Sequence, residues 1–134
     1  MHLFTYGSLM FPQVWTTVVR GDYKKQPARL QGHQRRRIKG ETYPAAIAAG
    51  LDNVIDGQLY MNISPEDMQR LDLFEGSDYE KIEAPVTLTD NSRVMAAVYL
   101  YRHHARLVEK DWDVEWFERE GITLFLAEYD GFER

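Results

Sequence analysis

Four residues near the start of the chain, Tyr6-Gly7-Ser8-Leu9, have the types and the position needed to bind an anion. They follow an apolar segment typical of a buried strand, and Pro12 then opens a segment with helical spacing. Backbone N–H groups at such a junction lack ladder partners and attract a carboxylate, a phosphate or an oxyanion, and Gly7 lets a ligand approach the backbone closely. An ordinary strand-to-helix turn is the alternative. The segment is neither a phosphate-binding loop nor a GxSxG elbow, because the residues that define those motifs are absent.

Glu75 is the second candidate, because its predicted surroundings favour a raised pKa. It falls in the last turn of a predicted helix, just before Gly76, where the helix carbonyls carry partial negative charge. Asp72 adds a like charge on the neighbouring helix face, and Phe74 with nearby aromatic residues excludes water. All three effects disfavour the ionised carboxylate, and a raised pKa suits a general acid or base near neutral pH. The alternative is a glutamate that points into water, as most do at helix ends.

The composition indicates one globular domain over residues 1–134. Hydrophobic residues make up 44% of the chain and aromatic residues 13%, which argues against disorder. The absence of cysteine excludes disulfides, thiolate zinc sites and cysteine nucleophiles. A net charge of -5 disfavours a nucleic-acid partner. No apolar run matches a membrane span and no signal-peptide pattern is visible, so we expect a cytoplasmic protein without a membrane partner.

The spacing of apolar residues predicts more strands than helices. A strand over about 1–6 leads into a helix that ends at Gly21, and Ser64 is a good N-cap for a second helix that ends at Gly76. The other predicted strands cover 26–39 (one strand or two), 45–48, 54–63, 81–89 and 94–102. The tail from Trp112 to about Tyr129 is mostly helical, with Gly121 as a candidate break.

Neighbouring strands in this order favour a mixed or antiparallel sheet. We therefore expect an α+β fold in which the sheet curls into a small barrel with helices packed outside, and not a doubly wound α/β fold.

Five segments, taken in order, resemble motifs of the γ-glutamylcyclotransferase-like family, which includes the γ-glutamylamine cyclotransferases and the plant avirulence-induced proteins. The segments are Tyr6-Gly7-Ser8-Leu9, Tyr43-Pro44-Ala45 with Ile47, Asp56-Gly57-Gln58-Leu59-Tyr60, Leu71-Asp72-Leu73-Phe74-Glu75-Gly76 with Tyr79, and Val98-Tyr99-Leu100-Tyr101. The resemblance covers roughly residues 1–102. No single segment is specific, and the ordered set carries the likeness.

The resemblance implies a small β-barrel with flanking helices and an enzyme whose catalytic acid/base matches Glu75. It also implies that Tyr6, Gly7, Ser8 and Leu9 hold the substrate, mainly through backbone N–H groups. The implied reaction is an intramolecular aminolysis, a cyclising acyl transfer. The α-amine of a γ-glutamyl compound attacks its own γ-carbonyl and releases 5-oxoproline and a free amine, with no metal or redox cofactor.

Tyrosines are further candidates for the pocket wall. Tyr43 and Tyr79 are predicted to bind substrate, and Tyr99 and Tyr101 fit a pocket or the core equally well. The family often has Arg where this chain has Lys81, and a lysine lacks the planar, bidentate grip on a carboxylate. The helical region 112–134 matches the family least, and it is the candidate for shaping the pocket around the leaving amine.

The expected partner is a small γ-glutamyl metabolite, an amine, amide or dipeptide, and the expected assembly is a monomer or a homodimer. Two alternatives stay open: a non-catalytic module on the same fold that binds a small carboxylate or a protein, and the same chemistry used to remove a γ-glutamyl protecting group. The binding module would show no turnover, and the removal of a protecting group would differ only in its pathway. The residues define neither property.

Three further patterns are interpreted as structural. The basic run Arg35-Arg36-Arg37 is expected to be a solvated strand face, with an anionic ligand or acidic partner as the alternative. His103 and His104 would point to opposite sides of a strand, which disfavours a shared metal. The aromatic residues Trp112, Trp116 and Phe117 are expected in the core, with a dimer patch as the alternative.

Overall fold

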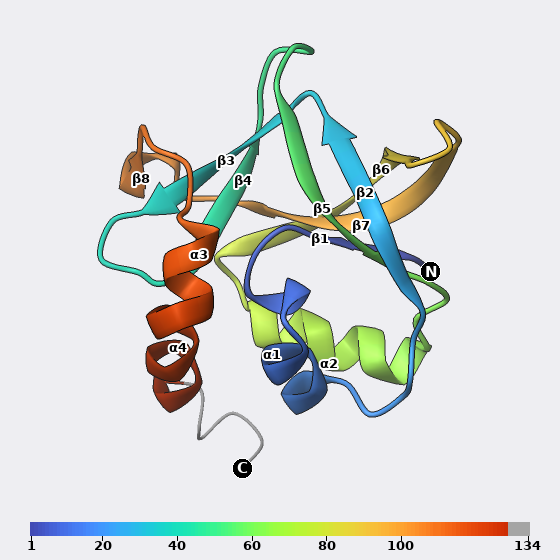
Figure 1. Cartoon of the computed structure of the whole chain (residues 1–134), viewed down its shortest axis with the longest axis horizontal. Coiled ribbons are helices and arrows are strands. Elements are labelled where there is room, and N and C mark those ends of the chain that lie inside the picture. The colour runs from blue at the N-terminus through green and yellow to red at the C-terminus, as the bar shows by residue number, and fades with distance from the viewer. Residues whose placement is uncertain (129–134) are drawn as a thin grey trace.

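A closed five-stranded barrel forms the centre of the molecule (Figure 1). The computed structural model describes residues 1–128, and in it the strands follow the order β1-β5-β2-β6-β7 around the barrel. These strands are β1 (Leu3–Thr5), β2 (Lys25–Gln31), β5 (Val54–Tyr60), β6 (Tyr79–Leu88) and β7 (Arg93–Tyr101). All neighbours are antiparallel except β1 and β7, which run parallel where the barrel closes. The predicted α+β barrel is confirmed.

A smaller sheet of three strands stands beside the barrel (Figure 1). Its order is β4 (Pro44–Ala48), β3 (His33–Ile38) and β8 (Leu107–Val108), and both pairings are antiparallel. The predicted strand region 26–39 thus forms two strands, which Gly32 separates at a φ of 79°. Glycine adopts this left-handed conformation without strain, so the chain can turn from the barrel into the second sheet.

Two helices form as the capping signals predict. Helix α1 (Pro12–Val18) and helix α2 (Pro65–Glu75) both have proline in the first turn, and the two pack near one end of the barrel (Figure 1). The Ser64 side chain accepts a hydrogen bond from the N–H of Asp67, and Gly76 ends α2 at a φ of 74°. Helix α1 ends at Val18, earlier than the predicted stop at Gly21.

The predicted break at Gly121 in the C-terminal helix is wrong. The chain runs through α3 (Val114–Trp116), a π-helical turn over Phe117–Gly121 and α4 (Ile122–Glu128). A Cβ at Gly121 would lie 2.7 Å from the Phe117 ring, so the glycine serves close packing within the widened turn. The predicted end near Tyr129 lies outside the described residues. Within residues 1–128, no helix has the length and apolar character that crossing a bilayer requires.

Apolar side chains that alternate along the strands fill the barrel. Five of them are fully or almost fully buried: Phe4, Leu30, Leu59, Val86 and Val98. Gly57 of β5 allows β1 to lie close, because a Cβ there would come within 2.2 Å of the carbonyl oxygen of Thr5. The glycine of the Asp56–Tyr60 motif is therefore needed for barrel closure.

Candidate active site

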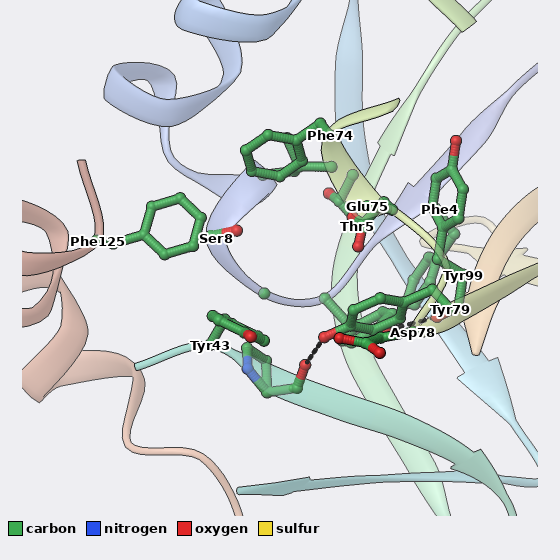
Figure 2. A pocket seen from close by; sticks show the side chains of 14 residues that line it. Phe4, Thr5, Ser8, Tyr43, Phe74, Glu75, Asp78, Tyr79, Tyr99 and Phe125 are labelled. Atoms are coloured by element: carbon green, nitrogen blue, oxygen red, sulfur yellow. Dashed lines mark hydrogen bonds between the residues drawn. The ribbon is translucent and has the colours of Figure 1, made fainter. Parts of the chain in front are cut away.

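All seven residues predicted to form the site line one cavity (Figure 2). The space between the atoms that line it is about 570 Å³, including the solvent at its mouth. It lies where the end of β1, the C-terminal end of α2 and the start of β4 and β6 meet. The predicted lining residues are Tyr6, Gly7, Ser8, Leu9, Tyr43, Glu75 and Tyr79.

The Tyr6–Leu9 loop presents backbone donors to this cavity. Strand β1 ends at Thr5, and a single 3₁₀ turn follows over Ser8–Met10. Within the described residues, no protein group accepts a hydrogen bond from the backbone N–H of Gly7, Ser8 or Leu9. These three N–H groups are therefore available to a ligand that accepts hydrogen bonds.

Gly7 has a reason for its small size that the sequence prediction missed. A Cβ at Gly7 would lie 2.8 Å from Cγ and 2.9 Å from Cδ of Pro44. The ring of Pro44, which belongs to the Tyr43-Pro44 segment, thus occupies the space that a side chain at Gly7 would need. That space is filled by the protein and is not left for a ligand. The two motifs are conformationally linked, because the proline ring packs directly on the loop backbone.

Glu75, the last residue of α2, is half-buried and lines the same cavity as the loop (Figure 2). Burial raises its pKa from 4.5 to about 8, in the predicted direction. The predicted contribution of Asp72 is not seen. The Asp72 carboxylate instead binds Nζ of Lys81 at 3.0 Å and accepts a hydrogen bond from Oη of Tyr99 at 2.6 Å. Burial therefore accounts for the raised pKa.

Tyrosine hydroxyls brace the walls of the cavity. Oη of Tyr79 donates to the carbonyl of Pro44 at 2.9 Å, and Oη of Tyr6 donates to the carbonyl of Tyr99. Burial raises the pKa of Tyr79 and of Tyr6 well above 10, with a contribution from the charge of Glu75. Both hydroxyls therefore stay protonated and hold the backbone around the site. The fourth tyrosine candidate, Tyr101, does not line the cavity.

Tyr99, a candidate for either the pocket or the core, lines the cavity, and six lining residues were not among the candidates: Phe4, Thr5, Pro44, Phe74, Asp78 and Phe125. Phe125 comes from α4 and is 1% exposed, with its ring centre 5.8 Å from that of Phe74 and 6.0 Å from that of Tyr43. The C-terminal helix thus contributes an aromatic wall. Its apolar spacing indicated burial, but spacing alone does not show which cavity a helix covers. Lys81 is bound to Asp72 and is not a lining residue.

The other patterns interpreted as structural have mixed outcomes. Trp112 and Phe117 are buried in the core as expected, and Trp116 is half-buried against it. His103 lies 2.8 Å from Asp78, and no cluster of three potential metal ligands occurs within residues 1–128. The expectation of a solvated face holds for Arg37, which is exposed, and is wrong for Arg35, whose side chain is only 13% exposed.

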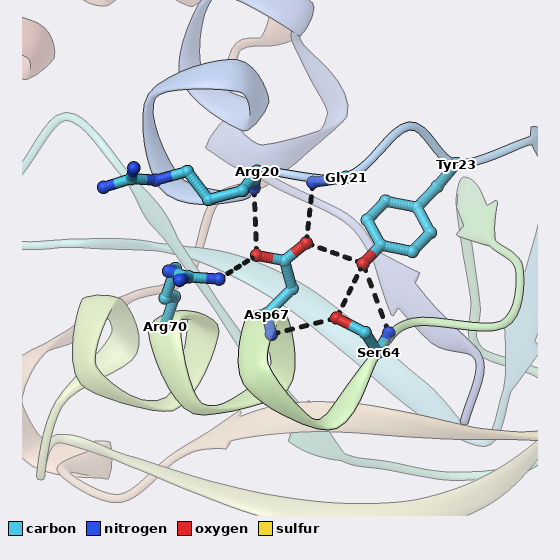
Figure 3. A network of polar contacts seen from close by, with 6 residues as sticks. All are labelled: Arg20, Gly21, Tyr23, Ser64, Asp67 and Arg70. Atoms are coloured by element: carbon cyan, nitrogen blue, oxygen red, sulfur yellow. Dashed lines mark hydrogen bonds and ion pairs between the residues drawn. The ribbon is translucent and has the colours of Figure 1, made fainter.

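Asp67 anchors the helix that carries Glu75 (Figure 3). Its carboxylate is 2% exposed and accepts hydrogen bonds from the backbone of Arg20 and Gly21 and from the side chains of Tyr23 and Arg70. Burial alone would raise its pKa, but these four donors outweigh burial and hold the pKa at about 2. Asp67 therefore ties the first turn of α2 to the segment that follows α1.

A closed five-stranded barrel with helices packed beside it places the chain in the class of small α+β barrels. The sequence model of the family described as gamma-glutamyl cyclotransferase, AIG2-like, matches residues 3–114. The chain belongs to this family, which confirms the resemblance.

Relatives in Arabidopsis thaliana share the family. AIG2-like protein D is 38% identical over 133 residues, covering 94% of this chain and 85% of the relative. AIG2-like protein A is 30% identical over 129 residues, covering 96% of this chain and 76% of the relative.

Solved structures share the fold. A solution structure of an Arabidopsis thaliana protein has a TM-score of 0.72 at 22% identity, covering 98% of this chain and 80% of that one. A structure of a gamma-glutamyl cyclotransferase has a TM-score of 0.65 at 18% identity, covering 75% and 66%. A gamma-glutamyl cyclotransferase specific to glutathione from yeast has a TM-score of 0.63 at 16% identity, covering 83% and 73%.

Replacing Asp67 with Asn should weaken the anchor of α2. A folded-state pKa of about 2, below the ordinary 3.8, stabilises the fold fully above about pH 3.8, and this stabilisation is lost as the pH falls to 2. We expect Asp67→Asn to lower the free energy of unfolding at pH 7 by about 2 kcal/mol in urea titrations. Glu66→Gln, at an exposed site in the same turn, is the control. Equal stability of the Asp67 and Glu66 variants would contradict the assigned role.

Glu75→Gln should have the opposite effect on stability at high pH. The folded-state pKa of about 8 lies above the ordinary 4.5, so the stabilisation by the protonated form is complete below about pH 4.5 and lost as the pH rises to 8. The neutral glutamine does not carry this penalty. We expect the variant to gain stability relative to the wild type between pH 5 and pH 9, by a few kcal/mol at most. Parallel pH curves in urea titrations would show that Glu75 is not buried as described.

Proposed function

We propose that this protein is a γ-glutamyl cyclotransferase in which Glu75 acts as the general acid/base on a γ-glutamyl amine, amide or dipeptide. The observation that carries the proposal is the cavity that Glu75 shares with the unpartnered amides of Gly7, Ser8 and Leu9. Membership in the gamma-glutamyl cyclotransferase, AIG2-like family supports it.

The first requirement is to deprotonate the attacking amine. A substrate α-amine is protonated near neutral pH and cannot attack a carbonyl in that form. The pKa of Glu75, about 8, lies close to that of polypeptide α-amino groups, which is also about 8, so a proton moves between them at a small free-energy cost. The free amine then attacks the γ-carbonyl carbon and forms the new C–N bond of the five-membered ring.

The same proton completes the reaction. Protonated Glu75 donates it to the leaving nitrogen as the tetrahedral oxyanion collapses and the original C–N bond breaks. The Glu75 carboxylate then takes the second proton of the ring nitrogen and passes it to the released amine, so that 5-oxoproline and the protonated amine leave. The nucleophile and the electrophile belong to one molecule, so the cavity has to hold a folded conformer of the substrate. The backbone donors of the loop are suited to hold the α-carboxylate or to stabilise the oxyanion that develops on the γ-carbonyl.

The aromatic wall completes the assignment of roles. Phe125 packs near Phe74 and Tyr43, with its ring centre 5.8 and 6.0 Å from theirs, and all three residues line the cavity (Figure 2). We assign this wall to the leaving group, because apolar rings exclude water around the nitrogen that receives the proton. A non-catalytic module that binds a small carboxylate is the alternative, since the same amides would hold such a ligand without turnover.

Turnover of a panel of γ-glutamyl amines, amides and dipeptides tests the proposal. We expect 5-oxoproline to appear with at least one substrate, and Glu75→Gln to lower kcat by at least about 100-fold, since glutamine neither accepts nor returns the proton. Glu66→Gln on the same helix should leave the rate unchanged, and circular dichroism should show that both variants are folded. Binding without turnover across the panel would favour the carboxylate-binding module. Full activity of Glu75→Gln would remove Glu75 from the mechanism.

The pH profile of kcat/KM should be bell-shaped with a maximum near pH 8. Below that pH, Glu75 is protonated in the free enzyme, and the rate should fall about tenfold per pH unit because the base is lost. Above pH 8, the substrate amine binds without its proton, so the complex lacks the proton that the leaving nitrogen needs. The value of kcat/KM should therefore fall on the alkaline side as well. An acid limb near pH 4.5 would contradict the assignment of a raised pKa to the catalytic base.

A further inference from the structure

Arg35 of β3 reaches the back of the substrate-binding loop. Its Nη1 donates a hydrogen bond to the carbonyl oxygen of Tyr6 at 3.0 Å. Arg35 does not line the candidate cavity, and it lines two other cavities instead. The carbonyl of Tyr6 is therefore held by a side chain that is not part of the cavity wall.

The geometry of the peptide bond links this contact to the site. None of the described peptide bonds is cis, so the C=O of Tyr6 and the N–H of Gly7 point in opposite directions across one planar unit. With the carbonyl held toward Arg35, the N–H of Gly7 is held on the other side, and Gly7 lines the candidate cavity. The hydrogen bond from a cationic guanidinium also polarises the peptide, which strengthens its N–H as a donor.

Arg35 is itself held in place. Its Nε and Nη2 bind the two carboxylate oxygens of Asp111 at 2.8 and 3.2 Å, and its guanidinium lies 5.5 Å from the ring centre of Trp112. Nε1 of Trp112 donates to the carbonyl of Thr42 at 2.7 Å, two residues before Pro44. The segment before the C-terminal helix thus fixes Arg35, which contacts the loop from one side, while Pro44 packs on Gly7.

We propose that Arg35 is the positioning residue of the amide cradle: it fixes the orientation of the Tyr6–Gly7 peptide so that the N–H of Gly7 is directed at the substrate. Arg35 acts through the backbone and does not touch the substrate. Its kinetic role rests on the proposed function, whereas its control of the peptide orientation does not.

Kinetics of Arg35→Met test the proposal, because methionine keeps an apolar stem and removes every donor. We expect kcat/KM to fall about 10- to 100-fold, with the loss mainly in kcat, as for a weakened oxyanion donor. A lysine cannot bind Asp111 and Tyr6 as the planar guanidinium does. The kcat/KM of Arg35→Lys should therefore lie between the values of the wild type and Arg35→Met. Arg37→Met, an exposed arginine on the same strand, is the matched control and should match the wild type. Full activity of a folded Arg35→Met, or an equal loss in Arg37→Met, would overturn the proposal.

The amide resonance of Gly7 in ¹⁵N-labelled protein provides a readout that needs no turnover. We expect it to shift or broaden in Arg35→Met and not in Arg37→Met, since the peptide loses its fixed orientation. If Arg35→Met does not fold, Arg35→Lys and Asp111→Asn, the latter at a carboxylate that is 62% exposed, should perturb the same resonance. An unperturbed Gly7 signal overturns the proposal. A perturbed signal in a protein without turnover supports the positioning role and counts against the proposed function alone.

Discussion

The candidate site depends on one constraint: the Glu75 carboxyl group is withdrawn from water with no hydrogen-bonding or ionic partner among residues 1–128. Helix α2 carries two carboxyl groups near its opposite ends, Asp67 and Glu75, and their surroundings shift the two pKa values in opposite directions. Asp67 accepts four hydrogen bonds and has a pKa held at about 2, whereas burial raises the pKa of Glu75 to about 8. Within the described residues, no basic side chain lines the cavity beside Glu75. A carboxyl in such surroundings keeps its proton at neutral pH unless a ligand takes it.

The barrel, the second sheet and the C-terminal helix position the loop and the aromatic residues that line the rest of the cavity. The barrel ends β1 next to the cavity, and the second sheet brings Pro44 and Arg35 against opposite parts of the loop that follows. The C-terminal helix adds Phe125, which packs near Phe74 of α2. The cavity is thus assembled from segments that are far apart in the chain, and each is held by contacts outside the cavity itself.

Local signals in the sequence predicted the elements well because their causes are local. The Ser64 cap, the proline after it and the glycine stop at Gly76 act within a few residues, and the structure confirms all three. Gly121 shows where such signals fail. A glycine near the middle of a helix suggested a break, but it lies in a π-helical turn where close packing against Phe117 requires its small size. The direction of the Glu75 pKa shift was also predicted, but the local contribution expected from Asp72 is not seen, and burial, which tertiary packing sets, produces the shift.

The sequence by itself determined the class of fold, the ends of α2 and the residues of the candidate site, since each follows from periodicity, capping and an ordered set of motifs. Only the tertiary structure decided that Pro44 fills the space at Gly7, that Lys81 binds Asp72, that Arg35 leaves the solvated face, and that Phe125 closes the cavity. These contacts join residues from different elements, and their partners are set by how the barrel closes and how the second sheet and the C-terminal helix pack beside it. Spacing along the chain carries no record of that packing, which is why Glu75 and the Tyr6–Leu9 loop could be listed before the structure and the contacts that hold them could not.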